Sequence, residues 1–349
     1  MTINGGAASR PGKLWALIAA ACILLVTLIG CGGGSSHEHA QRQFTFSGTH
    51  PIKVTCTTGQ VADIVREVGK PHVQVQHLMH GGTDPHLYEA SLDDLRRIRK
   101  ADIVFYSGLH LEGKMVSILE SHARRHACYA VTADLEESRL LGGDANTDGG
   151  MAHDPHVWFD VPLWAECVKH VGEVLAEFDA AHAGDYIANA TRYAEQLMRL
   201  HEEIAEKYRQ IPEAQRVLIT AHDAFGYLGR RYGLDVRGIQ GLSTEAEAGV
   251  GDIKASVDVL VERNVKAVFV ESSVPERFVH SLIAEARNRG HEVTVGGELY
   301  SDGMGQPGSA GETYVGMVRH NAKTIVEALK WASRQSRQPR RRRPWKSTT

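Results

Sequence analysis

The 349-residue sequence is poor in cysteine, in net charge and in long apolar runs, and each shortage argues against a class of protein. Five cysteines, most of them far apart, do not make a disulfide framework. A formal net charge of −3 and 7% aromatic residues give no indication of a nucleic-acid-binding surface. The most apolar run, Leu14–Ile29, is too short and wrongly flanked for a stable transmembrane helix. The sequence also lacks the helix-borne His-Glu-x-x-His motif of many zinc hydrolases.

The N-terminal segment is typical of an exported precursor. Arg10 and Lys13 precede the apolar run, and Leu28-Ile29-Gly30-Cys31 resembles the lipobox of bacterial lipoproteins. We therefore expect residues 1–30 to be a signal peptide and residues 31–50 to be a flexible tether that is lipid-anchored through Cys31. An uncleaved membrane anchor is the alternative. Under both interpretations the rest of the chain lies outside the cytoplasm.

The body of the chain alternates strand-like and helix-like segments, which is the βαβ rhythm of parallel sheets covered by helices. In the first half, the predicted strands and helices alternate along Val54–Thr58, Gln60–Val68, Val73–Leu78, Ser91–Lys100, Ile103–Ser107, Lys114–Ala123 and Cys128–Val131. In the second half, helical stretches separate the predicted strands Arg216–Thr220, Val236–Ile239, Ala267–Glu271 and Glu292–Val295.

Two long helical patterns, Pro162–Phe178 and Ala183–Arg209, separate these halves. The second would span about 40 Å and is expected to be a rigid spine, with two kinked shorter helices as the alternative. The predicted fold class is α/β: two Rossmann-like lobes of parallel sheet with flanking helices, joined by one long rigid helix. The predicted divisions are an N-terminal lobe at 51–182, the spine at 183–211, a C-terminal lobe at 212–333 and a basic disordered tail at 334–349. Contact of the tail with anionic lipid is the alternative to solvated disorder.

Two identical tripeptides, Asp84-Pro85-His86 and Asp154-Pro155-His156, are the most informative motif. Proline fixes its own φ and favours extended backbone before it, so each histidine is held by a stiff segment. Imidazole is the commonest metal ligand in proteins. The repetition predicts one metal site built from two distant loops.

Two further residues fit the same site. His222 follows a predicted strand, at the sheet edge where open α/β folds bind ligands. Asp302 lies in a loop expected after the strand Glu292–Val295 and a turn at Gly296-Gly297. Three imidazoles and one carboxylate would form a closed protein shell for a first-row divalent ion. Imidazoles must be neutral to bind metal, so their ordinary pKa of about 6.5 predicts that affinity falls as the pH drops through about 6.

The ordered motifs of the chain resemble the cluster A-I family, the substrate-binding lipoproteins of ABC importers for zinc and manganese. The resemblance covers about Pro51 to Leu329 and rests on Thr58–Asp63, Asp84–Glu89, Asp154–Trp158, His222–Tyr227, Tyr232-Gly233, Gly238–Glu247, Gly296–Asp302 and Gly311–Met317. It implies two α/β lobes bridged by one long helix, with the metal held in the cleft between them. Carried over residue by residue, the metal ligands fall on His86, His156, His222 and Asp302.

The resemblance also implies a cargo and partners. The cargo would be one divalent metal ion, Zn²⁺ or Mn²⁺ with Fe²⁺ as a further candidate, and the partners would be a membrane permease and its cytoplasmic ATPase. A monomer without catalytic residues is expected, anchored to the bacterial membrane on the cell-surface or periplasmic side. We expect carboxylates to orient the imidazoles, and proximity to the motifs indicates Glu89, Glu245, Glu247 and Glu271 as candidates.

The sequence departs from the zinc-scavenging branch of that family, because Gly142–Ala152 contains no histidine run before the second tripeptide. It is therefore more similar to the zinc/manganese branch. A zinc hydrolase and a siderophore- or haem-binding protein of similar architecture are the competing functions. A surface adhesin, a label attached to some relatives, has no support in the sequence and remains a secondary possibility.

Overall fold

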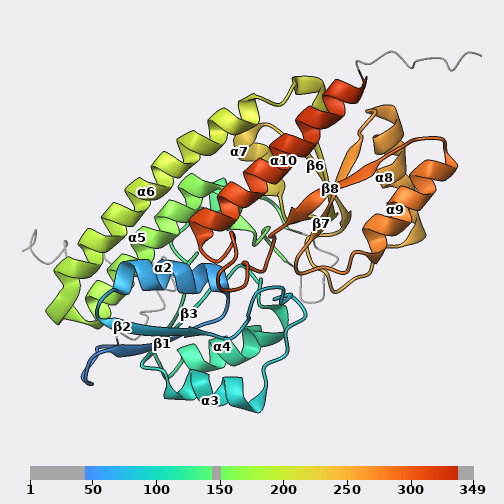
Figure 1. Ribbon diagram of the computed structural model, residues 1–349. Coiled ribbons are helices and arrows are strands. Elements are labelled where there is room, and N and C mark those ends of the chain that lie inside the picture. The colour runs from blue at the N-terminus through green and yellow to red at the C-terminus, as the bar shows by residue number, and fades with distance from the viewer. Residues whose placement is uncertain (1–43, 144–150, 337–349) are drawn as a thin grey trace, which may run out of the picture. The chain divides into compact units, whose positions relative to one another are not determined.

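The computed structural model describes residues 44–143 and 151–336, with side chains to residue 330. Within these ranges the first half of the chain forms one parallel sheet in the order β2-β1-β3-β4 (Figure 1). Its strands are β1 (Ile52–Cys56), β2 (Val73–His77), β3 (Ile103–Tyr106) and β4 (Cys128–Ala130). Its helices are α2 (Gly59–Gly69), α3 (Leu92–Lys100) and α4 (Val116–Ala123).

Both faces of this sheet are buried, and β3 shows how. Ile103 and Phe105 point into the main core, which also contains residues of α2, whereas Val104 packs with Ile98 of α3 and Leu119 of α4. Successive strand residues point to opposite faces, so a run of apolar residues is what a sheet covered on both sides requires.

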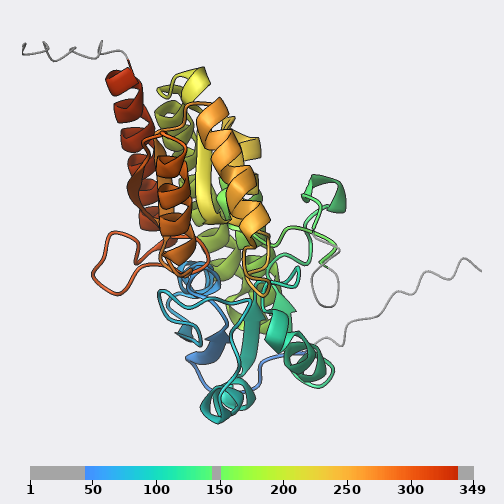
Figure 2. The ribbon, with the colours of Figure 1, turned by 90° about the vertical axis from the view of Figure 1, so that its right-hand side faces the viewer.

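The second half of the chain carries two parallel strand pairs. Strand β5 (Val217–His222) pairs with β6 (Asp235–Gln240), and β7 (Ala267–Glu271) pairs with β8 (Thr294–Leu299). Strand β5 also contacts β7. The helices of this half are α7 (Gly226–Tyr232), α8 (Val250–Glu262), α9 (Arg277–Asn288) and α10 (Tyr314–Ser336). Helices α8 and α9 contact each other and share a core with β5, β6 and β7 (Figure 2).

Helices α5 (Val161–Phe178) and α6 (Ala183–Arg209) connect the halves, and α6 is the predicted spine. It is one uninterrupted helix of 27 residues, so the kinked alternative is wrong. Its buried face recurs every three or four residues, which is the helical period: Tyr186, Ala190, Tyr193, Leu197, Leu200, Ile204 and Tyr208. This face contacts α5 and α2 of the first half and α7 and α10 of the second. The predicted α/β class with a long connecting helix is thereby confirmed.

The largest difference from the predicted elements is at β8. The sequence pattern ended this strand at Val295 and assigned Gly296-Gly297 to a turn, but the strand continues through both glycines to Leu299. Gly297 has φ 149°, and a Cβ there would lie 2.5 Å from Thr324 of α10. A Cβ on Gly296 would lie 2.8 Å from Ala328. The glycines therefore serve close packing of α10 on the strand and not a turn.

Two predicted boundaries also need correction. Residues 44–50 were assigned to the tether, yet Phe46 N–H donates to the Phe178 carbonyl and its ring packs on Phe178. Helix α10 runs to Ser336, three residues into the predicted tail. The predicted signal peptide, Cys31 and the rest of the tail lie outside the described residues. Among the described helices, none has both the length and the apolar character that crossing a bilayer requires.

Candidate metal centre

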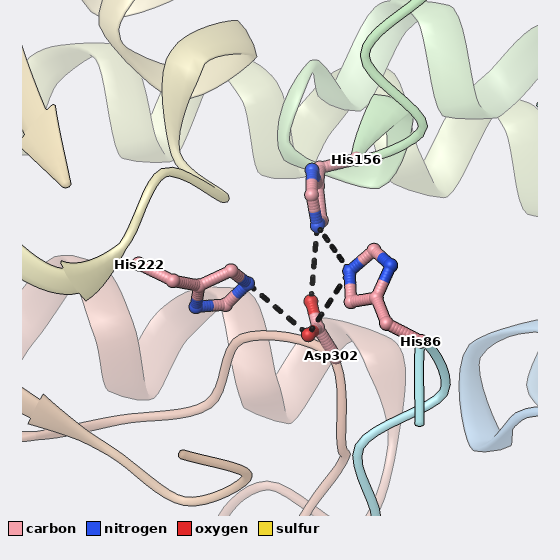
Figure 3. A group of neighbouring side chains, drawn as sticks. All are labelled: His86, His156, His222 and Asp302. Atoms are coloured by element: carbon pink, nitrogen blue, oxygen red, sulfur yellow. Dashed lines mark hydrogen bonds and ion pairs between the residues drawn. The ribbon is translucent and has the colours of Figure 1, made fainter. Parts of the chain in front are cut away.

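The four predicted ligands come from four separate segments of the chain (Figure 3). His222 is the last residue of β5, and Asp302 follows β8 by three residues. His86 lies in the loop after β2, and His156 immediately precedes the short helical turn that leads into α5. Carboxyl ends of parallel strands are where open α/β sheets gather ligand-binding groups.

The structure brings these side chains together, and all four are buried. Asp302 is at the centre of the group. Its Oδ2 lies 3.1 Å from His222 Nε2 and 3.7 Å from His86 Nε2, and its Oδ1 lies 3.3 Å from His156 Nε2. The Nε2 atoms of His86 and His156 are 3.4 Å apart. Each residue offers one ligand atom, and these atoms all lie within 4.8 Å of one another.

The chemistry of this group fits a metal ion. Among the described residues, both Asp302 oxygens and His222 Nε2 are buried and lie at ion-pair distances from other members of the group, but none of these three atoms makes a well-formed hydrogen bond. Buried polar atoms are normally satisfied, and a site where they are not requires an explanation. Three imidazole nitrogens and one carboxylate are the donor set of a borderline divalent ion such as Zn²⁺.

The two Asp-Pro-His tripeptides fold in the same way. In each, the aspartate Oδ1 accepts the N–H of the histidine two residues later, at 2.9 Å in both cases. Asp154 Oδ1 also lies 2.8 Å from His156 Nδ1, whereas Asp84 Oδ2 accepts the Thr244 hydroxyl at 2.6 Å. The sequence pattern indicates a role for the histidines of the two tripeptides only. Asp84 and Asp154 were missed, although their repetition within the motif was the available signal.

Glu271 holds the third histidine. Its Oε2 lies 2.5 Å from His222 Nδ1, and its Oε1 accepts the His222 N–H at 2.8 Å. With Nδ1 facing a carboxylate, Nε2 is the nitrogen turned toward Asp302.

The other three glutamates predicted to orient the imidazoles do not contact them in the described structure. Glu89 is 79% exposed beside Lys114, Glu247 is 72% exposed and paired with Arg277, and Glu245 is exposed. Their side chains point to solvent, a direction that proximity in the sequence does not reveal.

These contacts give the imidazoles different proton affinities. Burial lowers the pKa of His86 to about 3. Burial also opposes charge on His156, but the hydrogen bond and charge of Asp154, together with Asp302, raise its pKa to about 9. Burial also opposes charge on His222, but the carboxylates of Glu271 and Asp302 outweigh it and raise the pKa of His222 well above the ordinary value. The two charged imidazoles hold the pKa of Asp302 well below its usual range, against the effect of burial.

The Asp302 loop is anchored by residues of the first half of the chain. Gln60 of α2 donates from Nε2 to the Asp302 carbonyl at 2.7 Å. Trp158, two residues after His156, donates from Nε1 to the Ser301 carbonyl at 3.2 Å. The backbone that carries Asp302 is thus held by hydrogen bonds from helix α2 and from the segment that carries His156.

Comparison with known proteins points in the same direction. A family model described as "ZnuA: Zinc-uptake complex component A periplasmic" matches residues 54–328. The chain is 43% identical to the manganese-binding lipoprotein MntA of Bacillus subtilis strain 168 over 317 residues, which is 90% of this chain and 99% of that protein. It is 38% identical to the zinc-binding protein TroA of Treponema pallidum over 309 residues, covering 88% and 97% of the two chains. The solved structure of periplasmic TroA superimposes with a TM-score of 0.76 at 40% identity, over 80% of this chain and 99% of that one.

Proposed function

Because the chain belongs to the family of the periplasmic component A of zinc-uptake complexes, we propose that it captures a divalent transition metal ion and delivers it to an ABC permease for import. The observation that carries this proposal is the buried group His86, His156, His222 and Asp302, called here the four-residue cluster. Its donor atoms converge from both halves of the chain, and those of Asp302 and His222 lack hydrogen bonds among the described residues.

Zn²⁺ and Mn²⁺ are the proposed cargoes, with Fe²⁺ as a third. Relatives carry both names, manganese-binding for MntA and zinc-binding for TroA. Three nitrogen donors favour zinc, which is also bound more tightly than manganese by most sites of this kind. A manganese cargo would therefore depend on the ion's availability and on how Asp302 coordinates it.

A carrier role fits the cluster better than catalysis. A catalytic zinc usually has three protein ligands and keeps one position open for water. Here four protein groups converge, which would leave no position open for water on a four-coordinate ion. We infer that the ion is bound as cargo and that the chain has no catalytic residues. A siderophore or haem would not need three histidines and an aspartate.

The family also supplies the cellular context. The protein acts outside the cytoplasm at the bacterial membrane, as its lipoprotein relatives do. Its partners are the permease and the ATPase of the importer. Attachment through a lipid on Cys31 and a monomeric state are parts of this proposal. So are the domain divisions at 51–182, 183–211 and 212–333, with the outer limits extended to residues 44 and 336.

Elemental analysis of protein purified without added metal tests the proposal. We expect about one tightly held transition metal ion per chain, no organic chromophore, and loss of that ion in Asp302→Ala. His280→Gln is the matched control, because this exposed histidine also pairs with a carboxylate, Glu276, outside the cluster. A metal content in Asp302→Ala equal to that of the wild-type protein would contradict the assignment of the site. A bound chromophore would favour the haem or siderophore alternative.

A further inference from the structure

A second group of histidines and carboxylates lies at the end of the first sheet where strands β1 and β2 begin, away from the four-residue cluster. His50 precedes β1 and His72 precedes β2, while His182 and two aspartates, Asp179 and Asp185, lie at or beside the connection between α5 and α6. In Figure 1 this connection is at the lower left, near strands β1 and β2. We call these five residues the outer cluster.

The centre of the outer cluster is a single oxygen atom. Asp179 Oδ2 lies 2.8 Å from His50 Nε2 and 2.9 Å from His182 Nδ1, and it accepts the Tyr186 hydroxyl at 2.7 Å. Three donors therefore converge on one carboxylate oxygen. The carboxylate is fixed in place, since Asp179 is 4% exposed.

The imidazole rings are packed together and not spread over the surface. The His72 ring stacks on His182 with centroids 3.8 Å apart, and the His50 ring meets His182 edge-on at 4.5 Å. His72 Nε2 in turn pairs with Asp185 Oδ2 at 2.8 Å. Within the described ranges, the ion pairs of both aspartates are to histidines alone, with no lysine or arginine.

From this geometry we propose that His50, Asp179 and His182 form a second binding site for a divalent transition metal ion, with Zn²⁺ the best-suited ion. Their ligand atoms already lie within 4.8 Å of one another. Tetrahedral zinc with bonds of about 2.1 Å places its donor atoms about 3.4 Å apart. The two nitrogen–oxygen distances need to open by less than about 1 Å to admit the ion.

The surroundings suit an open site whose ion exchanges with solvent. His50 and His182 keep 35% and 30% of their side chains exposed, so an ion can enter and water can take the fourth position. His72, stacked on His182 and held by Asp185, orients the ring. The site would fasten residues 44–50, which pack on Phe178, to the start of the spine helix α6.

The outer cluster is separate from the four-residue cluster. The outer cluster lies before the amino ends of β1 and β2, whereas the four-residue cluster lies beyond the carboxyl ends of the parallel strands. The five residues of β1 alone span about 17 Å. Binding at one site can therefore be abolished without touching a ligand of the other.

Zinc titration by calorimetry tests the proposal, using the full chain in detergent without a polyhistidine tag. In the His222→Ala/Asp302→Ala background we expect one remaining equivalent of Zn²⁺. In that background, His50→Gln or His182→Gln should lower the affinity for this Zn²⁺ ion at least about 10-fold. This is the smallest loss typical of removing a residue that only supports a metal ligand, and a ligand itself should matter at least as much. If the background variant does not fold, the second equivalent is measured on wild-type protein already loaded with one equivalent. His280→Gln, a lone histidine–carboxylate pair, should leave the second equivalent unchanged.

Three results would overturn the inference: no second equivalent, a second equivalent unaffected by His50→Gln and His182→Gln, or its loss in His170→Gln. The last would place it at another surface group, Asp134, His170 and Glu173. Hydrogen exchange gives an independent readout, because zinc should slow exchange of the Phe46 amide in wild type and not in His182→Gln. In the His222→Ala/Asp302→Ala background, none of these outcomes depends on metal binding by the four-residue cluster.

Discussion

Metal binding to the four-residue cluster should displace about two protons at pH 7. His86 is neutral there, because burial lowers its pKa to about 3. His156, with a pKa of about 9, and His222, whose pKa is raised well above 6.5, are both protonated in the metal-free protein. Each must release the proton on Nε2 before that nitrogen can bind a metal, while Nδ1 keeps its proton toward Asp154 or Glu271. One divalent ion thus replaces two protons, and the buried charge is conserved.

The number of displaced protons sets how steeply metal affinity depends on pH. Groups whose pKa is raised in the metal-free state hold protons that compete with the metal, so affinity rises with pH until the pH passes those pKa values. Each competing proton contributes about 1.36 kcal/mol per pH unit. Two protons give about 2.7 kcal/mol, or about 100-fold in affinity, for each unit between about pH 7 and 9. Above about pH 9 the slope should fall to that of one proton, since His156 is then neutral.

The structure therefore shifts the pH range expected from the sequence. Free imidazoles predicted a loss of affinity only below about pH 6. The carboxylates on His156 and His222 move the proton competition upward, through neutral pH.

Calorimetric titration with Zn²⁺ in buffers of different ionisation enthalpy measures the proton count directly. Glu271→Gln removes the carboxylate on His222 Nδ1 and should reduce the count from about two toward one, because the pKa of His222 falls. Fewer than one proton released at pH 7 by the wild-type protein would refute the electrostatic reasoning. So would equal counts for wild type and Glu271→Gln.

Three further outcomes are expected. Cys31→Ser should release the protein from membranes or leave an unprocessed precursor, as fractionation would reveal; full processing and retention would contradict the lipid anchor. His222→Ala should weaken Zn²⁺ and Mn²⁺ together, whereas His222→Glu should lower the zinc/manganese affinity ratio, because oxygen donors suit the harder ion; parallel titrations decide this, and an unchanged ratio would place selectivity elsewhere. Leu197→Ala, in the buried face of α6, should lower the free energy of unfolding by about 2–5 kcal/mol. Met198→Ala, which truncates the half-exposed neighbouring side chain, should lower it far less. Equal losses for the two variants in denaturant unfolding would contradict the packing.

The long spine helix was predictable because its signal is local. Apolar residues from Tyr186 to Tyr208 recur at the helical period without glycine or proline, and the observed bounds Ala183–Arg209 are those of the predicted pattern. The repeated Asp-Pro-His motif was equally local. Its stiff backbone and its recurrence indicate His86 and His156 as ligands without information on any tertiary contact.

Other features depended on contacts between distant residues. Gly296-Gly297 has the local signature of a turn, but pairing of β8 with β7 and the approach of α10 make it strand. Four glutamates lie near the motifs in sequence, yet only Glu271 lies at the end of a buried strand beside β5, within reach of His222. Side-chain direction is set by the tertiary packing, so sequence proximity could not separate Glu271 from Glu89.

The sequence by itself thus determined the residue types and the local backbone from which the four-residue cluster is assembled. Only the tertiary structure decided which carboxylate meets which imidazole, and therefore which histidines hold a proton. The outer cluster is the clearest case. His50 and Asp179 are separated by 129 positions and share no motif, and they meet because residues 44–50 pack on the end of α5. Folding determines such contacts through the whole core, and no local pattern records them.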